Sequence, residues 1–419
     1  MITAVKMFLC GLSLKPINKK NFFVRLSVIF FVCAVLVSFL KPNLIILTAD
    51  DVKLNELQAE LEETVYSQLS SLDLKEIETI LKGLSDSEVA VFGAQNFGDK
   101  VSQIVSGQFA TGQQSIFSAV INLFFDDVLD FVPLLASVIV ISIICGFLSN
   151  LKSENGGRSV GDIIHFVCYG VVITLVMTAV VNLLKMTTST INGLRSQMEV
   201  VFPILLTIMT AIGGTASVSI YQPAVAFLSS GIMHIFTVVL MPIFIFSLVF
   251  TIVSNLTSTV KLDKFTKFFQ SAFKWLIGGV FTIFMAFLAI QGITASTYDG
   301  VSIRTAKYAI RSYIPILGGY LSEGFDVIMA SSVLIKNAVG ASGLLLMFAS
   351  VLSPIVKIVV CIFILKLAAA ILEPLTDQRI SDFIYSVSKS LSMLIVMILG
   401  VAFMYLITVG LIMCTANFV

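Results

Sequence analysis

Side chains that could do chemistry are few in this sequence, and they do not combine into a known reactive site. The two histidines, His165 and His234, have no plausible metal partner nearby in the sequence. The six cysteines show no CxxC and no Cys/His ligand spacing, so we expect them to pack as small apolar residues. No Walker A, GxSxG or HExxH pattern occurs. We therefore expect no enzyme activity, no cofactor and no metal, so any energy input must come from an ion gradient or a separate ATPase.

Charged residues inside apolar stretches are the remaining candidates for function, because a charge in a membrane span is costly. Lys366 is the better candidate for a buried ion pair or a pore-lining charge, whereas Lys357 follows Pro354 closely and can extend toward the interface. Three further charges lie in a broken apolar segment upstream, at Glu323, Asp326 and Lys336. These residues are candidates for a transport path.

A basic amphipathic stretch over residues 260–274 predicts an interfacial helix. Its aromatic residues gather on one side of the helix, and most of its lysines lie opposite. We expect this helix on the cytoplasmic leaflet, where lysines meet anionic lipids, or else as the docking face for a cytoplasmic partner. The lysines are Lys261, Lys264, Lys267 and Lys274.

The amino-acid composition shows whether the chain folds in water or in a lipid bilayer. Apolar residues make up 57% of the chain and charged residues only 12%, and the mean hydropathy is +1.01. Residues 200–260 contain no Asp, Glu, Lys or Arg, and neither do residues 390–419. One membrane crossing needs about 20 apolar residues, so these runs hold several spans. The sequence predicts an all-α polytopic membrane protein in a lipid bilayer, with no role in nucleic-acid binding.

The N-terminal third is organised by charge. Residues 1–49 are basic and contain a short apolar core, which predicts a signal peptide cleaved near Ala49 or an uncleaved signal anchor. Residues 50–130 are rich in acids and have leucines at helical spacing, which indicates an exported helical segment. This segment either docks a partner or caps the membrane domain, residues 131–419.

The membrane domain contains an internal repeat. Pro203-Ile204-Leu205 recurs as Pro315-Ile316-Leu317, and further landmarks repeat at the same spacing. The copies cover residues 163–274 and 275–389, with a partial copy at 131–162. In each copy an apolar span runs into a polar stretch that carries Lys or Arg, followed by another span. The positive-inside rule makes these stretches cytoplasmic and the repeats parallel.

Two apolar segments, one within each full copy, are interrupted by proline and glycine. The parallel topology allows two structures for residues 200–230 and 314–345: re-entrant hairpins, which we favour, or pairs of short crossing helices. We therefore expect about six transmembrane helices plus two hairpin regions. The hairpin candidates are Pro203, Gly213, Gly214, Pro315, Gly318 and Gly319.

The motif run from Tyr298 through Lys307 continues as YIPILGG over residues 313–319 and SEGFD over residues 322–326. With Lys336-Asn337-Ala338-Val339-Gly340, it resembles the stage III sporulation protein AE family over about residues 130–415. The resemblance implies a multi-pass protein of the mother-cell membrane around the forespore, in a channel sometimes called a feeding tube. It also implies partners: other proteins of the same stage III sporulation A operon, including a secretion-type ATPase and ring-forming proteins, and a forespore membrane protein.

The leading hypothesis is a channel or permease-like subunit of this sporulation transport complex, with a homo-oligomer as a further possibility suggested by the ring-like setting. One alternative is a self-sufficient secondary transporter of a small solute. The other is a scaffold that anchors the complex and conducts nothing.

Overall fold

The computed structural model describes residues 74–106, 113–151, 158–256, 262–313, 318–376 and 378–415. The chain divides into two units, residues 1–58 and 59–419, and every described residue belongs to the second unit. The predicted signal peptide or anchor, residues 1–49, therefore lies outside the described residues. Within the described ranges all regular structure is helical.

Three short helices cover part of the acidic segment: α4 (Lys75–Lys82), α5 (Asp86–Phe92) and α6 (Phe97–Val105). At the start of α5 the Ser85 backbone N–H donates to the Glu88 carboxylate at 2.9 Å, which completes a capping box. The apolar faces of the three helices are buried, and the helices contact α7, α8 and α13. This part of the acidic segment thus covers the helical bundle.

Six apolar helical segments are long enough to cross a membrane, which confirms the predicted all-α membrane fold. Five of them belong to long α-helices, and the sixth is a helical run interrupted by two π-helical segments, η2 and η3. The elements are α7 (Gln113–Leu151), α8 (Arg158–Ala211), α9 (Thr215–Ala226), η2 (Phe227–Ile232), α10 (Met233–Ile235), η3 (Phe236–Leu240), α11 (Met241–Leu256), α12 (Asp263–Tyr313), α13 (Gly318–Leu372) and α14 (Gln378–Cys414). Because α7 begins at Gln113, the predicted domain boundary at residue 131 falls inside a helix.

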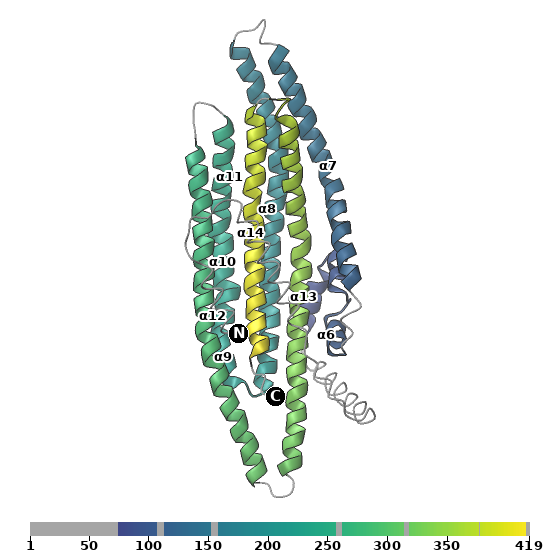
Figure 1. The fold of residues 1–419 in the computed structure, drawn as a ribbon, viewed down its shortest axis with the longest axis vertical. Coiled ribbons are helices and arrows are strands. Elements are labelled where there is room, and N and C mark those ends of the chain that lie inside the picture. The colour runs from purple at the N-terminus through teal and green to yellow at the C-terminus, as the bar shows by residue number, and fades with distance from the viewer. Residues whose placement is uncertain are drawn as a thin grey trace. The chain divides into compact units, whose positions relative to one another are not determined.

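The centre of the bundle is formed by α8, α13 and α14, which run beside one another (Figure 1). Two edge-to-face aromatic pairs join α8 to α14: Tyr169 with Phe383 and Phe202 with Tyr405, at centroid distances of 5.3 and 5.4 Å. On the outer side of this centre, α7 packs on α13, and α11 packs on α12. The tightest packing therefore lies where three long helices meet.

Several helices are longer than a membrane is thick. The helices α8, α12 and α13 have 54, 51 and 55 residues. At about 1.5 Å per residue each extends roughly 75–80 Å, whereas the hydrocarbon core is about 30 Å thick. On α8 the exposed large apolar side chains are Phe166, Val167, Val171 and Val181, all in its first half. This distribution indicates that about half of α8 lies in the bilayer and the rest extends beyond it.

The first broken segment, residues 200–230, contains a tight turn between α8 and α9. It does not form a separate re-entrant hairpin. Helix α8 continues through Pro203 to Ala211. It ends in a Schellman motif, in which the Gly213 N–H donates to the Thr210 carbonyl and the Gly214 N–H to the Met209 carbonyl, each at 2.9 Å. Gly213 has φ +91°, which favours glycine. The Pro203 side chain is exposed, and α8 continues through it although proline removes one of the helix's backbone hydrogen bonds.

The second broken segment was predicted over residues 314–345, but its described part, from Gly318 onward, is continuous helix in α13 and follows the end of α12 at Tyr313. Residues 314–317, including Pro315, are outside the described residues, while Gly318 and Gly319 are the first residues of α13. Helix–polar stretch–helix units occur at α7/α8, α11/α12 and α13/α14. The duplication behind them and their orientation in the membrane stay predictions.

The predicted interfacial helix is not a separate element. Residues 264–274 form the first turns of α12, and Lys261 lies outside the described residues. The rings of Phe265 and Phe269 stack on Phe250 of α11, at centroid distances of 5.4 and 5.3 Å. These ring contacts hold the start of α12 against α11, because stacked aromatic side chains bury apolar surface that a separate helix at the membrane surface would leave unpaired with protein. Lys264, Lys267 and Lys274 are exposed on α12.

Candidate functional site

Lys336 is the most deeply buried charge among the predicted candidates. Its side chain is fully buried in α13, and its Nζ donates a hydrogen bond to the backbone carbonyl of Thr415, just past the end of α14. The Thr415 hydroxyl also lies 3.0 Å from the hydroxyl of Tyr221 on α9. A cation at the carboxyl end of a helix complements the helix dipole and its free carbonyl groups. Lys336 therefore connects α13 to the end of α14, next to α9.

Small residues on the same face of α13 let the neighbouring helices approach closely. A Cβ atom added to Gly343 would lie 2.9 Å from Val201 Cγ1 of α8 and 3.3 Å from Tyr405 Oη of α14. One turn earlier, a Cβ on Gly340 would lie 2.6 Å from Met413 Cγ. Residues spaced three and four apart share a helix face, so Lys336, Gly340 and Gly343 form one line.

The line ends in a hydrogen bond between side chains of two helices. Gln197 Nε2 of α8 donates to Ser350 Oγ of α13 at 2.7 Å, and the Ser350 hydroxyl donates to the Leu346 carbonyl. We name this buried set the polar seam. It comprises Lys336, Gly340, Gly343 and Ser350 of α13, Gln197 of α8 and Tyr405 of α14.

Several polar atoms in and beside the polar seam are buried without a hydrogen-bond partner among the described residues. They are Gln197 Oε1, Asn337 Oδ1, Ser342 Oγ and Tyr405 Oη, contributed by the three central helices. An unsatisfied buried polar atom costs about 1–3 kcal/mol, and internal water is the usual partner in such places. Because Gly340 and Gly343 hold the helices in close contact, water or a polar solute would reach these atoms only if α8, α13 and α14 separated.

The other predicted site residues do not join Lys336. Lys366 is exposed on α13, which does not fit a buried ion pair within this chain, and its role as a pore-lining charge stays a prediction. It also lies about 45 Å from Lys336 along the helix, at 1.5 Å per residue. Asp326 is half-buried about 15 Å from Lys336 in the other direction. The side chain of Glu323 lies outside the described residues.

A charge pair that sequence reasoning missed joins α7 to α13. Lys357 Nζ lies 3.9 Å from Asp127 Oδ1, and the side chains are 41% and 5% exposed. Lys357 thus has an acidic partner instead of only extending toward the interface. In the sequence, only Asp127 indicated such a pair, because it is an acid next to the apolar run of α7. Its partner, Lys357, lies far away in the sequence and could not be assigned to it.

The structure also contains an open, mostly apolar hollow with a row of polar residues on one side, which we name the α8 groove. Its volume is about 540 Å³, and it is lined by Val181, Leu184, Lys185, Thr188, Ser189 and Asn192 of α8, Thr237 of η3, and Met241 and Ile245 of α11. The polar residues of α8 recur at three- and four-residue steps and so share one face. The run from Lys185 to Asn192 was the sequence signal, a polar interruption within an apolar helix. The π-helical segment opposite is a feature often found at functional sites.

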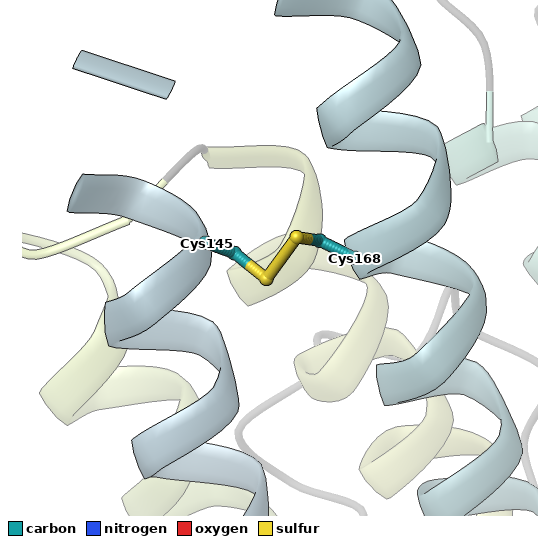
Figure 2. The surroundings of a disulfide bond; sticks show 2 residues. All are labelled: Cys145 and Cys168. Atoms are coloured by element: carbon teal, nitrogen blue, oxygen red, sulfur yellow. A yellow bond between two sulfur atoms is a disulfide. The ribbon is translucent and has the colours of Figure 1, made fainter. Parts of the chain in front are cut away.

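One pair of cysteines is bonded, so the expectation that they pack as small apolar residues is wrong for this pair. Figure 2 shows the disulfide between Cys145 of α7 and Cys168 of α8, whose Cα atoms are 5.8 Å apart. The two residues lie in different apolar runs, and only the packing of α7 on α8 brings them together. Charge counting places the neighbouring polar stretch 152–157 in the cytoplasm, where disulfides are rare. That orientation stays a prediction.

Comparisons with known proteins agree in one family. The family model described as stage III sporulation protein AE matches residues 95–416. Stage III sporulation protein AE of Bacillus subtilis (strain 168) is 26% identical over 315 residues, which cover 75% of this chain and 79% of that protein. No solved structure matches the chain.

Proposed function

The chain belongs to the stage III sporulation protein AE family, and from this premise we propose that it is a channel or permease-like membrane subunit of a mother-cell to forespore transport complex. In this proposal it resides in the mother-cell membrane around the forespore and is required for endospore development. Six membrane-capable helices suit a multi-pass subunit of this kind.

The observation that supports conduction is the polar seam. A conducting protein needs polar groups that replace water inside an apolar bundle, and these groups must belong to helices that can separate. Four buried polar atoms on α8, α13 and α14 have no partner among the described residues, and the buried Lys336 directly precedes one of these residues, Asn337, on α13. The seam is closed where Gly343 meets Tyr405 and Val201. Opening would therefore require α14 or α8 to move away from α13.

The partners are proposed from the resemblance. They are other proteins of the same operon, among them a secretion-type ATPase and ring-forming proteins, together with a forespore membrane protein. The chain has no Walker A motif, so in this proposal the ATPase supplies the energy. Helices that extend well beyond one bilayer thickness provide surface for such contacts.

Removing an unpaired polar atom tests conduction separately from folding. Tyr405→Phe deletes a buried hydroxyl that has no partner among the described residues, so we expect the thermal stability in detergent to stay the same or rise. If the hydroxyl lines a hydrated path, the yield of heat-resistant spores should fall severalfold at normal protein level. The matched control is Tyr385→Phe, because Tyr385 is exposed on the same helix.

Normal sporulation of both Tyr405→Phe and Ser342→Ala would contradict a path through the seam and favour a scaffold. A second measurement addresses the self-sufficient transporter. We expect the purified chain in liposomes to pass no small solute without its partners. Solute flux through liposomes that hold this protein alone would overturn the subunit proposal.

A further inference from the structure

The α8 groove lies at the edge of the apolar surface that faces lipid. On α8 the exposed large apolar side chains run from Phe166 to Val181, and no other follows before the helix ends at Ala211. On the opposite side of the groove, exposed large apolar side chains recur from Val238 along η3 and α11, whereas Phe227 is the only one in the described part of this helical run before Thr237. The exposed apolar surface is therefore dense on one side of the groove and sparse on the other, which places the boundary of the lipid-facing surface near the groove.

The length of the apolar stretch supports the same boundary. Between Asp162, the last charged residue before the apolar stretch, and Lys185, the helix rises about 34 Å at 1.5 Å per residue. This rise spans the hydrocarbon core of a bilayer, which is about 30 Å thick. Lys185 consequently lies at the depth of the lipid head groups, where a lysine finds phosphate oxygens and water.

The groove carries one charge, and that charge is positive. Lys185 is the only charged residue in the lining, which contains no acid. The hydroxyls of Thr188 and Thr237 already donate to carbonyls of their own helical turns. The donors that face a ligand are therefore Lys185, Ser189 and Asn192, at positions i, i+4 and i+7 of one helix face. Three such donors fit an anionic oxygen cluster such as a phosphate.

The remaining lining is apolar and lies on the membrane side of these donors. Val181 and Leu184 precede Lys185 on α8, and Ile245 follows Thr237 along the other helix into the apolar belt. We propose that the α8 groove binds an anionic phospholipid, with the phosphate at Lys185, Ser189 and Asn192 and an acyl chain along Val181, Leu184 and Ile245. A free anion would have no use for the apolar part of the groove.

Quenching of a single tryptophan by brominated lipid tests this proposal. The chain has one tryptophan, Trp275, exposed on α12, so the reporter protein carries Trp275→Phe and Ile245→Trp. The full-length reporter protein is reconstituted in vesicles that contain brominated phosphatidylglycerol or brominated phosphatidylcholine. A lysine near a membrane surface favours an acidic lipid by about fivefold, so we expect phosphatidylglycerol to compete for the reporter about fivefold better.

Adding Lys185→Met should abolish the preference, whereas Lys366→Met, which removes an exposed lysine of α13, should leave it unchanged. Circular dichroism of each variant checks that the helices are intact. Equal quenching by the two lipids, or a preference that survives Lys185→Met, would overturn the proposal. Displacement of phosphatidylglycerol by millimolar inorganic phosphate would assign the groove to a soluble anion and would also overturn the lipid proposal.

Discussion

The polar seam and the α8 groove use similar side chains of neighbouring helices in opposite ways. In the seam, Lys336 and Gln197 are buried and donate to groups on other helices. In the groove, Lys185 and Asn192 are exposed and face a hollow. Helix α8 takes part in both, because Gln197 and Asn192 lie on different sides of it. A lysine or an amide within an apolar helix thus has no fixed role, and the packing around it decides between a structural link and an open site.

The largest expected difference between the two regions is in their lysines. Lys336→Met should lower the free energy of unfolding in detergent by about 1.5–3 kcal/mol, because it removes a charged hydrogen bond to the end of α14. Lys185→Met should change it by less than about 0.5 kcal/mol, as is usual for an exposed position. Thermal unfolding of the two variants measures the contrast, and equal effects would remove the distinction between seam and groove.

The glycines of the two regions should respond with opposite signs. Gly343→Ala forces a Cβ to within 2.9 Å of Val201, and such overpacking costs about 1–3 kcal/mol. Gly193→Ala, on α8 near Asn192, meets nothing within 4 Å and should stabilise the helix by about 0.5–1 kcal/mol. Chemical unfolding in mixed micelles would compare them. A Gly343→Ala protein as stable as the parent would show that α8 and α14 are loosely packed there.

The amides provide a smaller contrast. Gln197→Leu should cost about 0.5–1.5 kcal/mol, because it removes the hydrogen bond to Ser350. Asn192→Leu should leave stability nearly unchanged, since this side chain is exposed. A double-mutant cycle of Gln197→Leu with Ser350→Ala measures the coupling between α8 and α13. Additive effects of these two changes would contradict a hydrogen bond across the seam.

The smallest expected effect concerns Lys100 of α6, a half-buried lysine outside the candidate spans. Burial lowers the pKa of its ammonium group, so the folded state disfavours the charged form. The unfolded chain then binds more protons between the lowered pKa and the ordinary lysine value near 10.5. Stability should therefore rise with pH across that window. Lys100→Met should flatten the rise in pH-dependent unfolding, and an unchanged slope would show that another group titrates.

Hydrophobicity could predict the fold class because the bilayer allows few solutions for a backbone. The apolar runs led to the six membrane-capable helices. Helix continuity was harder to predict: Pro203 and the glycine pair suggested broken segments, yet α8 passes Pro203 and uses Gly213 only to end. Proline removes one helical hydrogen bond, and in a membrane helix it is tolerated where neighbouring groups satisfy the freed carbonyl, whose position the sequence does not show.

The candidate site was only partly predictable. Lys336 was selected from its charge alone, and the structure places it in the buried seam. Lys366 satisfied the same criterion but is exposed, because nothing in the sequence states which face of α13 meets α14. Asp127, Gln197 and the groove residues were missed because the role of each depends on a contact with a residue of another helix.

The amino-acid sequence by itself determined the membrane environment, the class of fold and the family, since each follows from composition or from residues in linear order. Tertiary structure alone decided which charges are buried, which cysteines are bonded and where polar atoms lack a partner. The physical reason is that burial and hydrogen bonding are properties of pairs of helices. The contacts of α8 with α13 and α14 join residues more than a hundred positions apart, as Gln197 and Ser350 are.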